Sequence, residues 1–176
     1  HIDIDGNEGW KDEVTRNAAF VDRWLAEQDA TALQLIPYVA CVTADGKVLS
    51  YQRKGGGEGR LEGKCSIGIG GHVNTNDLPT GPDRTIDWNI IIDGAIRELV
   101  EELEITPEYA RGHLRQVGTI YTPSDDGGDH VGPGPNVGEV HLGIAYVLEV
   151  DSSMTIRDDE GMINPEFVET NIGTAG

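Results

Sequence analysis

Apolar residues recur along the chain at two spacings, one typical of helices and one typical of strands. Residues 11–28 have the helical spacing, which predicts an amphipathic helix with one broad apolar face formed by Val14, Phe20, Trp24 and Leu25. Two β-rich runs follow at 35–43 and 47–53, and the Ala-Asp-Gly turn between them predicts a hairpin. The chain is therefore expected to begin with a helix and a pair of strands.

The rest of the chain is also predicted to contain both strands and helices. An apolar strand that ends in two glycines is predicted at 66–73, and an exposed Pro/Gly-containing loop at 74–84. A helix is expected at 87–105, with Asp87 as N-cap and with core-facing Ile92, Ile96, Leu99 and Leu103. Two further strands are predicted, 114–122 and 139–150. Strands on both sides of a central helix indicate an α/β layered fold, and the many strands favour a mixed β-sheet over a doubly wound parallel one.

The size and composition of the chain favour one domain. With 176 residues and 38% hydrophobic composition, the chain can bury one substantial core, and we expect residues 1–34 to form a helical segment packed on a domain of residues 35–176. No run of about 18 apolar residues occurs, so no membrane span is expected. The acidic first residues lack the features of a signal peptide, which favours a cytoplasmic location. Cys41 and Cys65 are expected to be buried thiols.

The protein is strongly acidic. It has 31 acidic and 13 basic residues, which gives a net charge of −18. A surface of this charge repels nucleic-acid backbones and anionic membranes at long range, so neither duplex nucleic acid nor a membrane is an expected partner. An anionic substrate would need a local group of basic residues.

The stretch "RELVEELEI", residues 97–105, brings three like charges together. On a helix Glu98 faces Glu101 at i+3 and Glu102 at i+4, and each like pair costs a few tenths of a kcal/mol. Because the neighbouring Leu99 and Leu103 point to the core, the carboxylates are expected to be only partly solvated. Clustered oxygens suit a hard cation, Mg²⁺ or Mn²⁺, better than zinc. The alternative is a solvated helix face on which Arg97 pairs with Glu101.

Two stretches of the chain, "GGHV" and "AIRELVEELEI", together resemble the signature of the Nudix hydrolases, G-x5-E-x7-R-E-U-x-E-E-x-G-U, where U is aliphatic. The residues that match it are Gly71, Arg97, Glu98, Leu99, Glu101, Glu102 and Ile105. The resemblance extends to the strand order over roughly residues 35–150. It implies a Nudix-type α/β/α sandwich with a mixed sheet. Within the family, four stretches resemble a subgroup of small predicted phosphoesterases: "QLIPYV", "GGGEGRL", "SIGIGGHV" and "VGEVHLGIAY".

The resemblance implies a divalent-metal-dependent hydrolase that cleaves a pyrophosphate linkage in a nucleoside diphosphate derivative, by attack of water on phosphorus. The expected cofactor is Mg²⁺ or Mn²⁺. By the match, Glu101 and Glu102 are metal ligands, Glu98 is a further ligand or the base that activates water, and Arg97 orients the carboxylates. The backbone carbonyl of Gly70 or Gly71 would complete the coordination.

The chain departs from the signature in three ways. Gly71 and Arg97 enclose twenty-five residues instead of thirteen, which indicates a twelve-residue insertion within 73–88. The isolated glutamate of the signature falls on Asn89, for which Asp87 or Asp93 is a candidate substitute. The closing glycine is Glu104, which costs about 1 kcal/mol if the backbone is left-handed there, unless the helix continues.

Basic residues gather around a glycine-rich loop. Four of the thirteen fall within twelve positions, and they are candidates for binding substrate phosphate: Arg53, Lys54, Arg60 and Lys64. The two arginines are the better candidates, because guanidinium binds phosphate in a fork. An ordinary surface hairpin explains the pattern equally well.

A carboxylate outside the signature often supplies another ligand or the base in Nudix enzymes. Glu139, just before "VHLGIAY", is the candidate here, with Asp125, Asp126 and Asp129 as rivals. His141 is expected to be a strand residue with a hydrogen-bond partner rather than a catalyst. The aromatic residues Tyr51, Trp88 and Tyr121 are expected in the core rather than stacked on a base.

Two functional classes stay open from the sequence. One is a metal-dependent Nudix pyrophosphohydrolase that acts on a small nucleotide-type substrate. The other is a Nudix-fold module that binds or senses a nucleotide without cleaving it, which Asn89 and Glu104 keep in consideration. A homodimer is compatible with either class.

Overall fold

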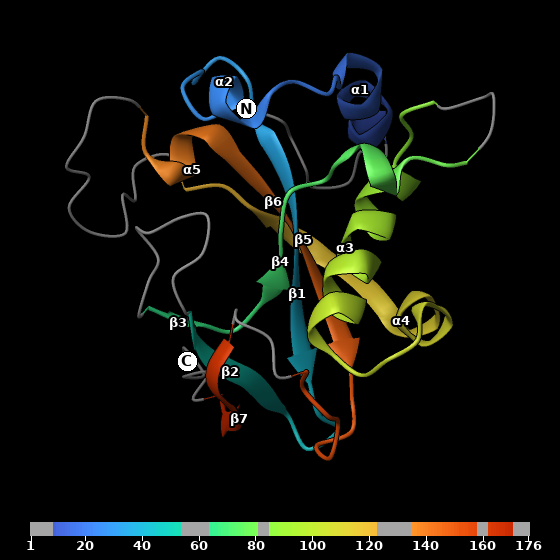
Figure 1. Cartoon of the computed structure of the whole chain (residues 1–176), viewed down its shortest axis with the longest axis vertical. Coiled ribbons are helices and arrows are strands. Elements are labelled where there is room, and N and C mark those ends of the chain that lie inside the picture. Colours follow the sequence, from blue (N-terminus) through green and yellow to red (C-terminus); the bar gives the residue numbers. More distant parts are fainter. Residues whose placement is uncertain (1–8, 54–63, 81–84, 123–134, 158–161, 171–176) are drawn as a thin grey trace. The chain divides into compact units, whose positions relative to one another are not determined.

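The computed structural model describes residues 9–53, 64–80, 85–122, 135–157 and 162–170 (Figure 1). The chain divides into two compact units that interleave in sequence. The first unit consists of His1–Pro37, Gly71–Ala95 and Gly118–Ala145, and the second of Tyr38–Gly70, Ile96–Val117 and Tyr146–Gly176. The assignment of residues 1–34 to a helical segment and of 35–176 to one domain stays a prediction. No helix within the described ranges is long and apolar enough to cross a membrane.

The described strands form one mixed β-sheet, as predicted. In chain order they are β1 Gln34–Val42, β2 Lys47–Arg53, β3 Cys65–Ser66, β4 Ile69–Gly70, β5 Leu114–Ile120, β6 His141–Glu149 and β7 Met162–Glu169. The main path of the sheet runs β3-β2-β1-β6-β5, while β4 pairs with β1 and β7 pairs with β2. The run at 66–73, predicted as one strand, contributes only the second residue of β3 and the two residues of β4.

The predicted hairpin is confirmed. The strands β1 and β2 pair antiparallel with Val42 opposite Val48. In the turn, the Thr43 N–H donates to the Lys47 carbonyl at 2.9 Å and the Gly46 N–H donates to the Thr43 carbonyl at 2.9 Å. Gly46 has a φ of 87°. A glycine is therefore needed here, since side-chain-bearing residues rarely adopt this conformation.

The helix predicted at 11–28 is wrong: the chain forms α1 Gly9–Asn17 and the short α2 Arg23–Ala26 instead. Asn17 ends α1 by donating its side-chain amide to the Glu13 carbonyl at 2.8 Å. Asp22 begins α2 by accepting the Trp24 N–H on its carboxylate at 2.9 Å. Local capping by Asn and Asp competes with a continuous helix, which the apolar spacing alone did not reveal.

The apolar face predicted for this helix is also wrong. Phe20, Trp24 and Leu25 are 38%, 67% and 57% exposed. The buried aromatic residue is Trp10, whose ring lies edge-on to Trp88 with centroids 4.9 Å apart. This contact joins α1 to the segment that leads into α3, Asn89–Glu102, within the first unit.

The central helix α3 confirms the main prediction, with shorter ends than expected. Asp87 accepts the Asn89 N–H at 2.8 Å, which supports its predicted capping role. Ile96, Leu99 and Leu103 are buried as expected, whereas Ile92 is only half-buried. Instead, the residues that fill the core before Ile96 are Ile90, Ile91 and Ala95. The buried face of α3 therefore begins at Ile90 and not at Ile92.

At its C-terminal end, α3 is closed by another segment of the second unit. Leu103 forms an isolated antiparallel bridge with Ile156. The Arg157 backbone N–H donates to the Glu102 carbonyl at 2.9 Å, and its side-chain Nε donates to the Leu103 carbonyl at 3.0 Å. Glu104 has no positive φ, so neither expectation for it holds: the helix does not continue and the backbone is not left-handed. Arg157 therefore donates hydrogen bonds to the last carbonyls of the helix, which a closing glycine usually helps to satisfy.

Two short helices were not predicted. They are α4 Pro107–His113, which Thr106 caps by accepting the Tyr109 N–H at 3.2 Å, and α5 Val137–Val140. Consequently Glu139 lies in a helix and not in the predicted strand.

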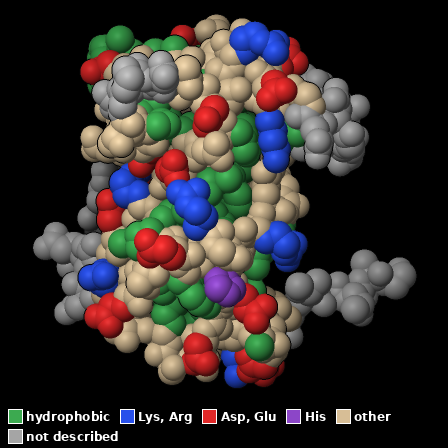
Figure 2. Space-filling model, turned by 90° about the vertical axis from the view of Figure 1, so that its right-hand side faces the viewer, with side chains coloured by type: hydrophobic (Ala, Val, Ile, Leu, Met, Phe, Trp, Pro, Cys, Tyr) green, Lys and Arg blue, Asp and Glu red, His purple; other side chains and the backbone are tan. Residues whose placement is uncertain are grey.

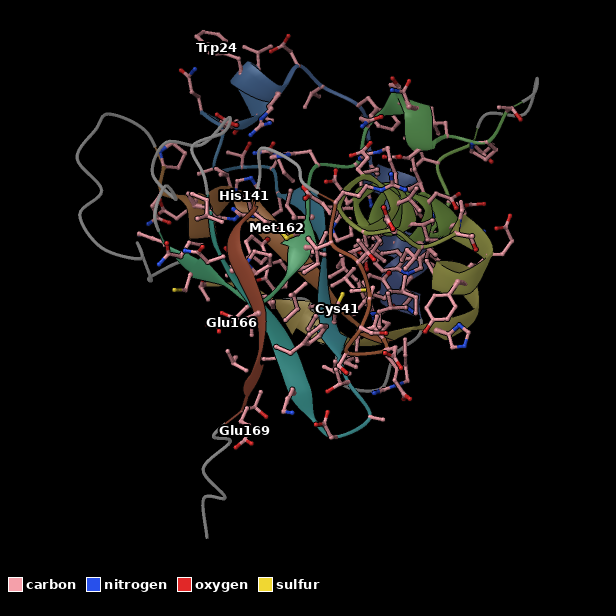
Figure 3. All side chains as sticks on the ribbon, turned by 60° about the horizontal axis from the view of Figure 1, so that its bottom comes forward. Trp24, Cys41, His141, Met162, Glu166 and Glu169 are labelled. Atoms are coloured by element: carbon pink, nitrogen blue, oxygen red, sulfur yellow. The ribbon has the colours of Figure 1, made fainter. Side chains whose placement is uncertain are left out.

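The last described strand, β7, pairs with β2 along its length. The register runs antiparallel from Lys47 opposite Glu169 to Arg53 opposite Met162, with an irregularity near Ser50. Glu166 and Glu169 mark this strand in Figure 3.

The two cysteines differ in exposure. Cys41 is buried on β1, and burial raises the pKa of its thiol to about 12. Cys65 is exposed, contrary to prediction, because β3 has only two residues and lies at the end of the main strand path.

We predict that Arg157→Ala lowers the free energy of unfolding by about 1 kcal/mol, because it leaves the half-buried Leu103 carbonyl without its side-chain donor. Urea denaturation measures the change. The exposed Arg115→Ala on β5 serves as the control and should change stability by less than about 0.5 kcal/mol. Equal effects of the two substitutions would contradict the capping role of Arg157.

Candidate functional site

The predicted carboxylate row lies on the C-terminal half of α3, in the second unit. Arg97 Nη1 donates to Glu98 Oε1 at 2.7 Å and to Glu101 Oε2 at 3.3 Å. The side chain of Glu98 is 16% exposed, that of Arg97 23% and that of Glu101 53%. The row thus lies at the edge of the core, as the spacing predicted. Arg97 reduces the repulsion between two of its three carboxylates.

Glu102 is the third member of the row. Its side chain is half-buried, and its Oε2 atom is shielded from solvent. Within the described residues, no group of three or more His, Cys, Asp or Glu side chains is arranged to hold a metal ion. Carboxylate oxygens are nevertheless the type of ligand that a hard cation such as Mg²⁺ prefers. Coordination would therefore require the exposed Glu101 to turn away from Arg97.

The two glycines that the resemblance implicates fall in different units. Gly70 ends β4, opposite Tyr38 of β1, in the second unit. Gly71 begins the adjoining segment of the first unit. The role of their carbonyls in binding metal stays a prediction.

Two of the four candidate phosphate-binding residues are described, and the structure brings them together. Arg53 ends β2, and its backbone N–H donates to the Lys64 carbonyl at 3.0 Å. The two residues therefore face each other across the β2–β3 pair. Lys54 and Arg60 lie outside the described residues.

Glu139 has a structural role that the sequence did not indicate. Its Oε2 accepts the Asn136 N–H at 2.8 Å, while the Asn136 side chain accepts the Glu139 N–H at 3.1 Å. This reciprocal capping box starts α5. Its rivals Asp125, Asp126 and Asp129 lie outside the described residues.

His141, the first residue of β6, has hydrogen-bond partners as predicted. Its Nδ1 lies 2.8 Å from the Val137 carbonyl, and its Nε2 lies 3.3 Å from Nε2 of His72. Desolvation, followed by the charges of Arg23 and His141, lowers the pKa of His72 to about 4. His72 is thus uncharged near neutral pH. No local pattern singles out His72, because its partner is 69 positions away in the chain.

The predicted insertion, within residues 73–88, contains a buried carboxylate where an exposed loop was expected. A 3-10 helix covers Thr75–Asp77, and Asp77 is only 6% exposed. The Asp77 carboxylate accepts the Asn74 N–H at 2.9 Å, completing a capping box. A Cβ atom added to Gly94 of α3 would lie 3.3 Å from Asp77 Oδ2. Glycine at this position therefore lets the insertion approach the helix, and the Asn-x-x-Asp spacing is the signal that could have revealed it.

The aromatic residues follow the core prediction only in part. Tyr51 is buried, and its hydroxyl donates to the Gly68 carbonyl at 2.7 Å. Trp88 is half-buried against Trp10. Tyr121 is 50% exposed and does not belong to the core.

Figure 2 shows one face of the molecule, on which acidic and basic side chains are interspersed. Among the described side chains of that face, no extended basic area is visible. This distribution agrees with the inference that an anionic substrate would need a local group of cations.

Comparison with known proteins identifies the fold. The chain is similar to Tm1382, named as a candidate Nudix hydrolase, with 24% identity and a TM-score of 0.62 over 92% of this chain and 71% of that one. It is also similar to a bifunctional NMN adenylyltransferase/ADP ribose pyrophosphatase from Francisella tularensis, with 16% identity and a TM-score of 0.53 over 94% of this chain and 38% of that one. The chain therefore has the fold of the Nudix hydrolases.

One curated relative by sequence is protein YmaB of Bacillus subtilis. The two are 34% identical over 136 residues, which cover 77% of this chain. The chain spans 58% of the length of YmaB. No protein-family model matches the chain.

We predict that Asp77→Ala lowers the free energy of unfolding by about 1–2 kcal/mol, because it removes a buried cap from the insertion. Thermal or urea denaturation measures the loss. Glu166→Ala, which removes an exposed carboxylate on β7, is the control for the change in net charge. A stability equal to that of the control would show that the insertion does not depend on Asp77.

Proposed function

We propose that the chain belongs to the Nudix family and is a Mg²⁺-dependent (or Mn²⁺-dependent) hydrolase that cleaves a pyrophosphate linkage in a nucleoside diphosphate derivative. The observation that carries the proposal is the ordered row on α3, where Arg97 bridges Glu98 and Glu101 in the register of the Nudix signature. The Nudix fold of the chain supports it.

The exposures of the row suggest different roles for its members. The Arg97–Glu98 contact is short and mostly shielded, so it should persist and keep Glu98 in one orientation. The Arg97–Glu101 contact is longer and half-exposed, and such pairs contribute little to stability. Glu101 is therefore the carboxylate that can turn toward a metal at small cost.

In the proposed site, Glu101 and Glu102 are the principal ligands, and Glu98 is a further ligand or the base that takes a proton from the attacking water. A backbone carbonyl of Gly70 or Gly71 completes the coordination. A divalent metal bound there supplies charge neutralisation for the pyrophosphate and lowers the pKa of water. If Glu98 acts as the base, its fixed orientation beside Arg97 keeps its oxygens aimed at one position. Glu139 is a second candidate for the base, although its carboxylate also caps α5.

The substrate's phosphates require cations to bind them, and four of the thirteen basic residues of this acidic chain fall within positions 53–64. We assign this role to Arg53 and Lys64 at the β2–β3 pair and, from the sequence, to Lys54 and Arg60, which lie outside the described residues. ADP-ribose belongs in any substrate test, because a fold relative is described as an ADP ribose pyrophosphatase. A cytoplasmic location and a homodimeric state remain predictions.

The second candidate function is nucleotide sensing without cleavage. Asn89, where the signature has its isolated glutamate, favours it, because this exposed amide next to Asp87 provides no negative charge.

We predict that the wild-type protein hydrolyses at least one member of a panel of nucleoside triphosphates, ADP-ribose, NADH and dinucleoside polyphosphates when Mg²⁺ is present. Glu101→Gln and Glu102→Gln should each lower kcat by at least about 100-fold, because each removes a charged ligand. In metal-free buffer their stability should stay within about 0.5 kcal/mol of wild type or rise, since each relieves repulsion. Phosphate release and urea denaturation measure the two effects.

Glu104→Gln is the matched control, because it removes an exposed glutamate just outside the row and should leave kcat unchanged within about twofold. Full activity in Glu101→Gln or Glu102→Gln would contradict the assigned ligand roles. No turnover of any panel member, with one compound still raising the melting temperature, would favour the sensing module.

A further inference from the structure

Two imidazole rings from distant parts of the chain meet within the first unit. His72 follows Gly71, and His141 begins β6 (labelled in Figure 3). Their Nε2 atoms are 3.3 Å apart, and their ring centroids are 5.3 Å apart at an interplanar angle of 70°. The rings therefore approach through their nitrogens and are not stacked on each other.

The separation of these nitrogens matches that of two ligands on one metal ion. Imidazole nitrogens bind zinc at about 2.0–2.1 Å, and two such nitrogens in a tetrahedral site lie about 3.3–3.4 Å apart. The observed 3.3 Å therefore fits the edge of a metal tetrahedron, and it is also compatible with a direct N–H···N hydrogen bond.

The orientation of His141 is also that of a metal ligand. Its Nδ1 lies 2.8 Å from the Val137 carbonyl, so Nδ1 carries the proton and Nε2 presents its lone pair. A backbone carbonyl on the second nitrogen is a usual partner of metal-bound histidine. His72 offers the matching lone pair when its own proton resides on Nδ1. This is a change of tautomer and involves no net gain or loss of protons.

We propose that His72 and His141 form a binding site for a borderline divalent transition-metal ion such as Zn²⁺, distinct in ligand chemistry from the carboxylate row. Within the described residues no third His, Cys, Asp or Glu side chain completes the cluster, so two positions go to water or to an oxygen of a bound phosphate. Imidazole favours Zn²⁺ over Mg²⁺, whereas carboxylates favour the reverse.

Two charged side chains from one helical segment act on His72. They are Arg23 and Glu27, which form an ion pair with a distance of 2.7 Å. Arg23 acts more strongly on His72 than Glu27 does, so Glu27 offsets the positive charge only in part. The net charge of −18 attracts cations over the molecule as a whole. This inference does not depend on the proposed hydrolase activity.

Titration of EDTA-stripped protein tests the site. We predict that isothermal titration with ZnCl₂ in 10 mM Mg²⁺ detects a site whose affinity falls at least about tenfold in His72→Ala and in His141→Ala. His113→Ala should retain it, because His113 is an exposed histidine on α4 outside the pair. Glu101→Gln and Glu102→Gln should retain it too, which separates this site from the proposed magnesium ligands.

Co²⁺ absorption provides a second measurement that reports the ligand sphere itself. The wild type should develop visible bands of cobalt with nitrogen ligands, and His141→Asn should lose them while keeping a wild-type circular dichroism spectrum. The proposal is overturned if wild type binds no Zn²⁺ under these conditions, or if either alanine variant binds it as tightly as wild type. In that case the pair is a hydrogen bond alone.

Discussion

The contact between Arg97 and Glu98 is the constraint on which the candidate site depends. Helical spacing places three carboxylates along one side of α3, and their repulsion would favour fraying of the last turns. Arg97 offsets this repulsion from within the row, through a mostly shielded contact of 2.7 Å to Glu98. Its weaker contact to Glu101 leaves that side chain able to change partner. One guanidinium can therefore keep the helix intact without a metal and still allow a metal to bind.

The end of the same helix shows how a departure from a family signature can be compensated. A glycine usually closes such a helix by adopting a left-handed conformation. Here Glu104 occupies that position, and the backbone N–H and side chain of Arg157 bond to the Glu102 and Leu103 carbonyls. The substitution therefore changes how the helix ends without removing the partners of its last carbonyls. Glu104 is consequently weaker evidence against catalysis than Asn89 is.

Local patterns predicted the elements whose structure is determined locally. The Ala-Asp-Gly turn required the positive φ of Gly46, and the apolar spacing of α3 identified Ile96 and Leu99 of its buried face. Prediction failed where side-chain capping or distant partners decide the outcome. Asp22 starts a separate helix, which leaves Trp24 exposed, and the apolar spacing carries no information on such capping. The meeting of His72 and His141 depends on tertiary structure and has no local signature.

The carboxylate row lies on one helix as its spacing predicted, because the three positions fall within about one helical turn, while its ligand role stays a prediction. Three oxygen donors at i, i+3 and i+4 are neighbours wherever the helix forms, so their ligand preference follows from spacing alone. The contact between His72 and His141 could not be predicted in this way, because the residues around each histidine carry no pattern that points to the other. Oxygen and imidazole ligands select different cations, so a chain with both arrangements can respond separately to magnesium and to a transition metal. Ligand type, rather than overall charge, would then decide which ion binds at each arrangement.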